Sequence, residues 1–464
     1  MKSEQKSQRS INYSRYDEPF SQCLSSWHKA EAVKLLILLL QIQEYLLPQD
    51  HDGGILARPI LRWRVGTGGV RADKMALMSI VVSLSIAVYA FYIVLFTITC
   101  SFATDDFVLW SELIHHTSLM YLGIFIRSVL ILEAKEMIKL ARDYLDGIYH
   151  YEEGYVDPIF QQLQDKSRKL QRKLFMLPLF IVLVTGIALG LKPLLDDVNE
   201  VEPHPKLLEN GITYRSLIPI FYPFNNENTY QVLLMNGALL YFAFLVVVTV
   251  IAADLLFIRV SCRISLEIAI LVESLNLIDK RAKRLYARKY GLNKKNESWP
   301  LYQDCIEECI KENVKHHQKI IIFYEQFSAV AAPAIGGGFF TCTIVLGLGM
   351  IVVNMDNVNI SDIIAFVGTV FAEMMNAFMI SWMSEKIGEQ NYELYNAVYN
   401  LKWFKWRQSN KKLVITFLDG TRQPLFLIAF GMATINMEAF GSVVNTAYSF
   451  LNLVNASETL EEKK

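Results

Sequence analysis

The sequence predicts an all-α membrane protein with seven transmembrane helices, a cytoplasmic N-terminus and an extracellular C-terminus. Hydrophobic residues make up 53% of the 464 residues, and the mean hydropathy is +0.27. Soluble domains have roughly 45–50% apolar residues. Seven segments are apolar over about the 20 residues that a helix needs to cross a bilayer core. Lys and Arg are concentrated in alternate connections between these segments.

The chain begins with a polar segment, 1–74, that contains the apolar run "AVKLLILLLQIQEYLL" at 32–47. Because Gln41, Gln43 and Glu44 interrupt this run, we expect a re-entrant or interfacial helix there. The predicted spans follow at residues 75–103, 107–133, 174–191, 229–258, 320–353, 361–385 and 425–454.

The basic residues predict the orientation of these spans, because cytoplasmic loops close to the membrane carry an excess of Lys and Arg. The segment up to residue 74 has 11 of them, and the connections between spans 2 and 3, 4 and 5, and 6 and 7 have 8, 13 and 7. On the other side, each connection and the C-terminal tail have between zero and three Lys and Arg residues. We therefore expect the four basic segments to be cytoplasmic, which is opposite to the arrangement in a G-protein-coupled receptor.

Two of the basic connections, residues 259–319 and 384–420, also show helical periodicity. Their apolar residues recur at spacings of three and four. Helices of this kind cannot bury their apolar faces alone. We expect a cytoplasmic helical platform, in which 259–319 joins a ligand-binding bundle, 75–258, to an anchor and pore region, 320–464.

The last span is unusual because it contains polar residues in "GSVVNTAYSFLNLVNAS" at 441–457. At 100° per residue these fall on one helical face, namely Gly441, Asn445, Tyr448, Asn452 and Asn455. Two interpretations fit this stripe. It lines a water-filled pore built from several copies and closed by an apolar ring such as Leu451 or Val454, or it hydrogen-bonds to neighbouring helices.

Ionisable residues within spans give two further candidate sites. Glu112, His115 and His116 share a face of span 2, where they form either the polar rim of a ligand pocket or a group at the headgroup level. Asp254, Glu325 and Glu373 lie near span ends or on bundle faces. They indicate either an inner vestibule that attracts cations or simple interfacial placement.

Several short stretches are shared with one family in order and spacing. They are "IPIFYPFNNENTYQ" at 218–231, "KHHQKIIIFYEQF" at 315–327, the Tyr399 to Trp403 spacing, "QPLFLIAFG" at 423–431 and "AYSFLNLV" at 447–454. From Cys309 onward the chain thereby resembles the insect odorant receptors, seven-span proteins of inverted topology. Its connection between spans 4 and 5 is shorter than that of the obligate co-receptor, so the resemblance is to a ligand-tuned receptor.

The resemblance implies an odorant-gated, non-selective cation channel in the plasma membrane of a sensory neuron dendrite. It implies a homotetramer, or a heterotetramer with a co-receptor, whose central pore is lined by the last span with Asn445, Tyr448, Leu451, Asn452, Val454 and Asn455. It also implies an apolar odorant pocket in the outer half of spans 2, 3, 4 and 6. The candidate residues are His115, Leu119, Gly186, Leu189, Met235, Leu239, Phe242, Phe366, Thr369, Val370 and Met374.

Two alternatives stay open, a metabotropic seven-span receptor and a gustatory-type channel. The ending "AYSFLNLV" differs from the Thr-Tyr and Gln-Phe ending of gustatory receptors. No enzyme signature is present, since "GTGGVRADK" at 66–74 lacks phosphate-cradle spacing and Cys305, Cys309, His316 and His317 only loosely suggest zinc. We expect no enzyme activity, cofactor, metal or nucleic-acid partner. The expected partners are small volatile odorants and membrane lipid.

Overall fold

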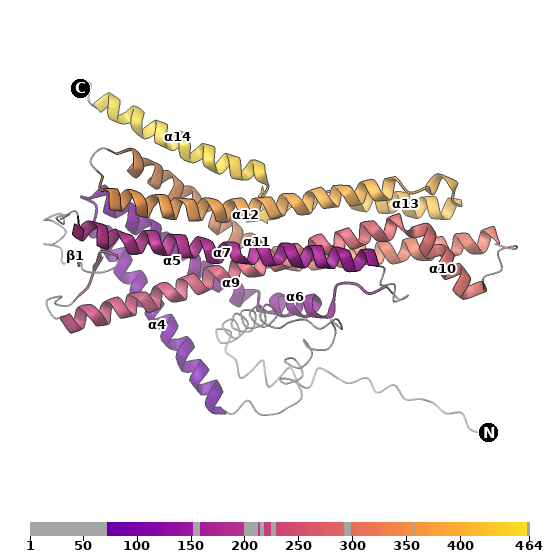
Figure 1. The fold of residues 1–464 in the computed structure, drawn as a ribbon, viewed down its shortest axis with the longest axis horizontal. Coiled ribbons are helices and arrows are strands. Elements are labelled where there is room, and N and C mark those ends of the chain that lie inside the picture. The colour runs from indigo at the N-terminus through magenta and orange to yellow at the C-terminus, as the bar shows by residue number, and fades with distance from the viewer. Residues whose placement is uncertain are drawn as a thin grey trace.

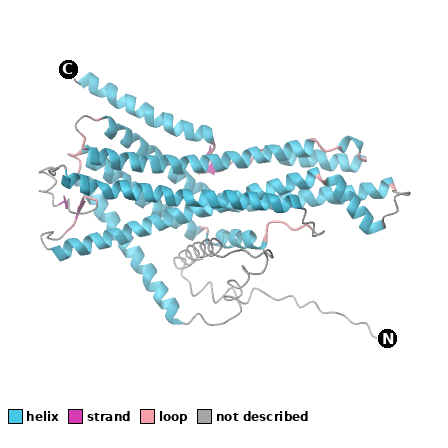
Figure 2. Ribbon diagram, viewed as in Figure 1, coloured by secondary structure: helices cyan, strands magenta, loops and turns pink. Residues whose placement is uncertain are grey.

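The chain is almost entirely helical in the computed structural model (Figure 2), which describes residues 72–151, 158–198, 212–213, 218–223, 229–291, 298–355 and 358–461. Within these residues, seven long helices overlap the seven predicted spans: α4 (Ala72–Phe102), α5 (Phe107–Leu132), α7 (Pro158–Val198), α9 (Thr229–Asn276), α11 (Trp299–Asn354), α12 (Ile360–Tyr399) and α14 (Met437–Glu461). The predicted interfacial helix at 32–47 lies outside the described residues.

Most of these helices run side by side along the length of the molecule, whereas α4 and α14 diverge from the bundle (Figure 1). Four described stretches are long and apolar enough to cross a bilayer: Pro158–Lys192, Leu233–Asn276, Trp299–Asn354 and Ile360–Lys405. Exposed side chains on α7 are apolar between residues 174 and 191, for example Leu183 and Ile187. Such a surface suits hydrocarbon and not water, so the predicted all-α membrane class is confirmed.

The predicted platform is helical. The helices α9, α11 and α12 continue beyond the predicted span ends, and α10 (Ile278–Tyr290) and α13 (Gln408–Thr421) lie at the same end of the molecule (Figure 1). We call this end the platform. The opposite end, where α4 joins α5 and α11 joins α12, is called the distal end. A short helix, α6 (Ala134–Asp146), follows α5, and a 3-10 turn (Trp403–Lys405) precedes α13.

A buried polar network holds the platform together. His316 of α11 is fully buried, with its Nε2 atom 3.0 Å from the Glu267 carboxylate of α9 and its Nδ1 atom 2.9 Å from the Tyr151 hydroxyl. Arg281 of α10 donates hydrogen bonds to Ser274 and to Asn313, the latter at 3.0 Å. Buried polar groups need such partners, because each unsatisfied one costs about 1–3 kcal/mol.

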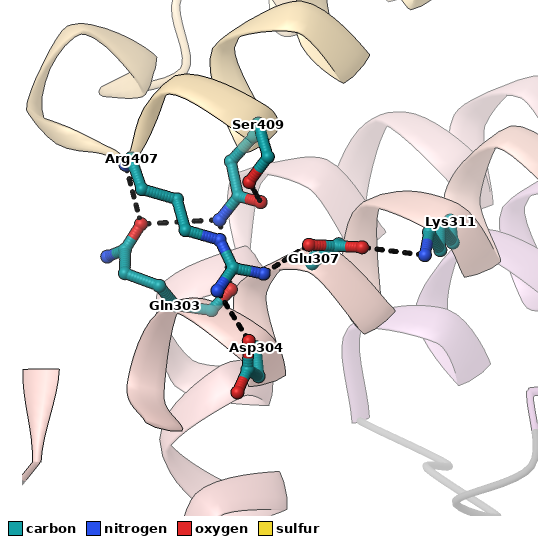
Figure 3. Close-up of polar contacts among 7 residues, drawn as sticks. Gln303, Asp304, Glu307, Lys311, Arg407 and Ser409 are labelled. Atoms are coloured by element: carbon teal, nitrogen blue, oxygen red, sulfur yellow. Dashed lines mark hydrogen bonds and ion pairs between the residues drawn. The ribbon is translucent and has the colours of Figure 1, made fainter. Parts of the chain in front are cut away.

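The helix α13 is fastened to α11 by a second network, which Figure 3 shows. The Arg407 guanidinium reaches between Asp304, at 2.5 Å, and Glu307. The backbone N–H of Arg407 and the amide of Asn410 both donate to Gln303. Hydrogen bonds from Lys311 and Arg407 hold the pKa of Glu307 below its ordinary value. The carboxylate therefore stays charged and paired at neutral pH.

The short strands form two antiparallel pairs. Near the distal end, β1 (Ile212–Thr213) pairs with β2 (Ile220–Phe221), and the backbone N–H of Phe221 donates to Thr99 of α4 at 3.0 Å. The second pair, β3 (Ile428–Ala429) with β4 (Ala433–Thr434), lies between α13 and α14.

This second hairpin corrects the predicted last span, 425–454, whose start is wrong. The chain turns through Phe430, with φ at 49°, and Gly431, with φ at 72°, and α14 begins only at Met437. Residues 430–432 thus form a short hairpin loop between Ala429 and Ala433, and positive φ is common in tight hairpin turns. The apolar run "PLFLIAFG" therefore forms an extended segment and a turn before the helix starts.

Contacts with two long helices hold this hairpin in place. The Phe430 ring lies against Gly336 of α11, where a Cβ would collide with it, and the Tyr324 hydroxyl donates to the backbone oxygen of Phe426 at 2.6 Å. From α12, Ser384 accepts the Leu427 N–H at 2.9 Å. The hairpin is thus fixed to α11 and α12 just before α14 begins.

Candidate functional site

The three predicted pocket residues of α9 lie in an aromatic cluster at the distal end. Met235, Leu239 and Phe242 are at most 5% exposed and pack against α4. The rings of Tyr92 and Phe242 stack at 4.8 Å between centroids, and the Tyr92 hydroxyl donates to the Met235 backbone oxygen at 3.2 Å. These side chains fill the space between α4, α5 and α9.

The predicted pocket residues of α12 pack elsewhere, against α11 and α7. A Cβ on Gly349 of α11 would collide with Val370, and one on Gly368 would collide with Ala188 of α7. Phe366 and Thr369 are buried, whereas Val370 and Met374 are partly buried. The α12 group and the α9 group therefore belong to different parts of the core.

The predicted pocket residues of α7 and α5 differ from one another in burial. Gly186 is exposed with open space in front of it, and Leu189 and Leu119 are half-buried. His115 is 4% exposed, and its ring stacks on that of His116 at 5.3 Å. His115 and Leu189 each lie three residues from a member of a charged cluster at the distal end, Glu112 and Lys192 respectively.

That cluster is an ion triad of Glu112, Lys192 and Asp362. The Lys192 ammonium pairs with Glu112 of α5 and lies 2.9 Å from Asp362 of α12. The side chains of Lys192, Glu112 and Asp362 are only 11%, 5% and 13% exposed, respectively. One cation from α7 therefore holds two anions from two other helices. A further hydrogen bond, from Ser361 to Asp196, also joins α12 to α7.

The sequence pattern pointed to Glu112 but not to its partners. Lys192 belongs to the predicted connection between spans 3 and 4, although it follows the apolar run at 174–191 directly. Asp362 lies at the corresponding end of the run at 361–385. Opposite charges at span ends on the same side of a membrane were the available signal. The triad joins α5, α7 and α12, three of the four helices expected to wall the pocket.

The polar stripe of α14 faces away from the protomer. Asn445 and Asn452 are exposed, and Tyr448 is 58% exposed. By contrast, Leu451 is only 9% exposed and Ala447 only 1%, because this side of α14 faces the bundle. The side chains of the two other predicted pore residues, Val454 and Asn455, lie outside the described residues.

The exposed faces of α7 and α14 differ in polarity. The exposed residues of α7 between 174 and 191 are all apolar. Between 442 and 453, the exposed residues of α14 are mostly polar: Ser442, Asn445, Thr446, Tyr448, Ser449, Phe450, Asn452 and Leu453. Within the described part of the chain, the amides of Asn445 and Asn452 make no hydrogen bond. Hydrocarbon offers them no partner, so this face requires water or another protein chain.

We predict that Lys192→Met lowers the free energy of unfolding by about 3–5 kcal/mol, because it leaves two buried carboxylates without a counter-ion. The melting temperature of the purified chain in detergent measures this loss. Adding Glu112→Gln and Asp362→Asn to the same chain should restore much of the stability, since no buried charge is then left unpaired.

The matched control is Arg168→Met, which breaks a surface pair with Asp165 whose side chains are 49% and 64% exposed. Exposed pairs contribute about 0–1 kcal/mol, so this variant should melt close to the wild type. Equal melting temperatures for Lys192→Met and Arg168→Met would show that the triad does not hold the helices together.

Known proteins share the sequence pattern of this chain. The family model described as 7tm Odorant receptor matches residues 161–448. Odorant receptor 46a, isoform B, of Drosophila melanogaster is 30% identical over 78 residues, covering 17% of this chain and 20% of that protein. Odorant receptor 2a of the same species is 22% identical over 192 residues, covering 40% and 47%. Each match thus spans less than half of the relative's length.

The fold is similar to that of a solved receptor. The insect olfactory receptor OR5 from Machilis hrabei aligns with a TM-score of 0.64 at 12% identity, covering 84% of this chain and 92% of that chain. Its complex with eugenol aligns with a TM-score of 0.62, covering 84% and 93%. The family match covers more than half of the chain and the fold agrees with it, so the chain belongs to the 7tm odorant receptor family.

Proposed function

We propose that this chain is an odorant receptor that works as a ligand-gated, non-selective cation channel. As a multi-pass membrane protein of the odorant receptor family, it is not an enzyme. The observation that supports channel function best is the exposed polar face of α14, with Asn445, Tyr448 and Asn452. Amide and hydroxyl groups that lie in a membrane and lack protein partners can replace part of the hydration of a passing cation.

The same face supports assembly of several chains. A polar helix face directed at lipid would leave each amide unsatisfied, and copies of α14 packed around a common axis would place these amides in shared water. We propose a tetramer, formed either by this chain alone or with a co-receptor. Val454 is the proposed apolar residue that closes the pore by dewetting. The alternative predicted from the sequence, Leu451, lies on the side of α14 that faces the bundle and is only 9% exposed, so it does not face this pore.

The ligand is proposed to be a small volatile odorant held in the distal half of the bundle. The candidates are the predicted residues on α5, α7, α9 and α12, of which the α9 group and the α12 group would contact a ligand from different parts of the core. The resolved complex of the Machilis hrabei receptor is with eugenol, a ligand of that receptor. An apolar pocket with few polar groups would select ligands mainly by shape, since one methylene changes binding by about 1–3 kcal/mol.

The helix α12 supports coupling between ligand and pore. Its distal end carries Asp362 of the triad, and its middle holds the segment that leads into α14, through Ser384 and Glu385. Glu385 accepts the N–H of Met437, the first residue of α14, at 3.2 Å. A ligand that binds the open arrangement more tightly would shift α12 and α14 together.

Orientation and location are part of the proposal. The basic platform is expected in the cytoplasm, because Lys and Arg mark cytoplasmic segments, and the end of α14 outside. The chain is proposed to act as a tuned receptor in the plasma membrane of a sensory neuron dendrite.

We predict that Asn445→Ala and Asn452→Ala change the relative permeability of Na⁺ and Ca²⁺, or the basal current, by about fivefold. Each amide that hydrates a cation contributes on the order of 1 kcal/mol. Patch recordings of odorant-evoked current, from cells expressing the chain alone and then with a co-receptor, measure this effect. An odorant panel that evokes no current in either setting would contradict channel function itself.

The matched control is Leu183→Ala, which alters an exposed position on α7 that the proposal assigns to lipid. It should leave permeability and basal current unchanged. If both Asn variants behave like this control while odorant still opens the channel, α14 does not line the pore.

Epitope tags at the two chain ends test the orientation. An antibody should label the C-terminal tag on intact cells and the N-terminal tag only after permeabilisation. An N-terminal tag labelled on intact cells would reverse the orientation and favour a metabotropic seven-span receptor.

A further inference from the structure

We propose that a cavity on the platform side of the bundle binds a small protonated amine with an apolar body. The cavity is enclosed by α5, α9, α11 and α12, with Leu140 of α6 at its edge. None of the eleven predicted odorant-pocket residues lines it, so it is separate from the proposed distal site. The inference does not depend on whether the chain conducts ions.

The space is large enough for a ligand. Its volume is about 100 Å³, whereas a single buried water needs about 10–15 Å³ on the same measure. The walls are almost entirely apolar, with Leu122 and Ile126 from α5, Phe257 from α9 and Phe327 and Ile335 from α11. Sites for small molecules have this composition, with a few polar groups that fix orientation.

Three lining residues have polar side chains, Thr249, Asp254 and Asn376. Thr249 is occupied: its hydroxyl donates to the Leu245 backbone oxygen at 2.8 Å and accepts from Arg127 at 3.0 Å. The Arg127 guanidinium also covers the Tyr89 ring, 4.4 Å from its centroid. The Arg127 cation beside this part of the cavity is therefore already engaged.

The other two polar groups lack partners. Among the described residues, Asp254 makes no hydrogen bond or ion pair, and the charge that acts on it is a second carboxylate, Glu373 of α12. The Oδ1 atom of Asn376, one turn further along α12, is buried without a hydrogen-bond donor. Each of these groups is an acceptor that needs a donor.

A protonated amine matches this arrangement. A carboxylate in apolar surroundings that feels the charge of a second carboxylate is stabilised either by a nearby cation or by a proton. An ammonium group has three N–H donors, enough for Asp254 and Asn376, which both line the cavity, and its bond to a carboxylate is charge-assisted. A short hydrocarbon tail would then fill the apolar part of the cavity.

The glycine at 338 gives a direct way to block the cavity. Gly338 lines it, and a Cβ at this position would meet no atom within 4 Å. A larger side chain at this position therefore starts in open space at the cavity wall. Gly237 of α9 also has nothing within 4 Å but is exposed and does not line the cavity, so Gly237→Leu is the matched control.

The test is equilibrium binding of radiolabelled n-hexylamine to the full chain in lipid nanodiscs at pH 7, with competition by unlabelled n-hexylamine or 1-hexanol. The wild type should bind one amine per chain, and the alcohol should compete about tenfold or more weakly. Asp254→Asn, which keeps the shape but removes the charge, should weaken amine binding by about tenfold or more. Gly338→Leu should abolish it.

Two control variants, Gly237→Leu and Asp165→Asn, should bind the amine like the wild type. The second removes an exposed carboxylate that does not line the cavity. The proposal is wrong if the wild type shows no saturable amine binding, since the carboxylates then share a proton instead. It is equally wrong if Asp254→Asn binds the amine as tightly as the wild type, or if Gly338→Leu retains binding.

Discussion

The hydrocarbon core of a bilayer cannot form hydrogen bonds, and the placement of polar groups in the spans of this chain follows from that constraint. Long helices satisfy the backbone, and apolar side chains such as Leu183 and Ile187 face outward on α7. Three largely buried charges at the distal end form a triad in which Lys192 holds two carboxylates. Where polar groups are left without partners, on α14 and in the platform-side cavity, the constraint indicates that water, another chain or a ligand completes them.

These features are linked through one helix. α12 carries Asp362 at the distal end, packs on α7 through Gly368, and holds the hairpin and the start of α14 through Ser384 and Glu385. Closer to the platform, α12 makes a further hydrogen bond to the segment that precedes the hairpin, because Asn391 donates to the backbone oxygen of Gln423 at 2.8 Å. A displacement of α12 relative to α11 would therefore move the start of α14.

Features that depend on local pattern were predictable, and those that depend on distant partners were not. Apolar runs located the long helices, and three-and-four spacing located the platform. The start of α14 was misplaced because residues 425–436 are as apolar as a span, whereas Ser384 and Gly336, distant in sequence, fix them as a hairpin. Lys192 and Asp362 were missed for the same reason. Helical phase did predict the shared face of Asn445 and Asn452, but only the packed structure shows that this face is exposed.

The central claim is that the exposed face of α14 meets water in a pore. The most direct measurement is cysteine accessibility during odorant-evoked current, with a cationic, membrane-impermeant thiol reagent and the unsubstituted chain as reference. The account predicts that Asn445→Cys and Asn452→Cys are modified and lose current, whereas Ala447→Cys, on the buried side of the same helix, is unaffected. Modification and block at position 447, with none at 445 and 452, would contradict it.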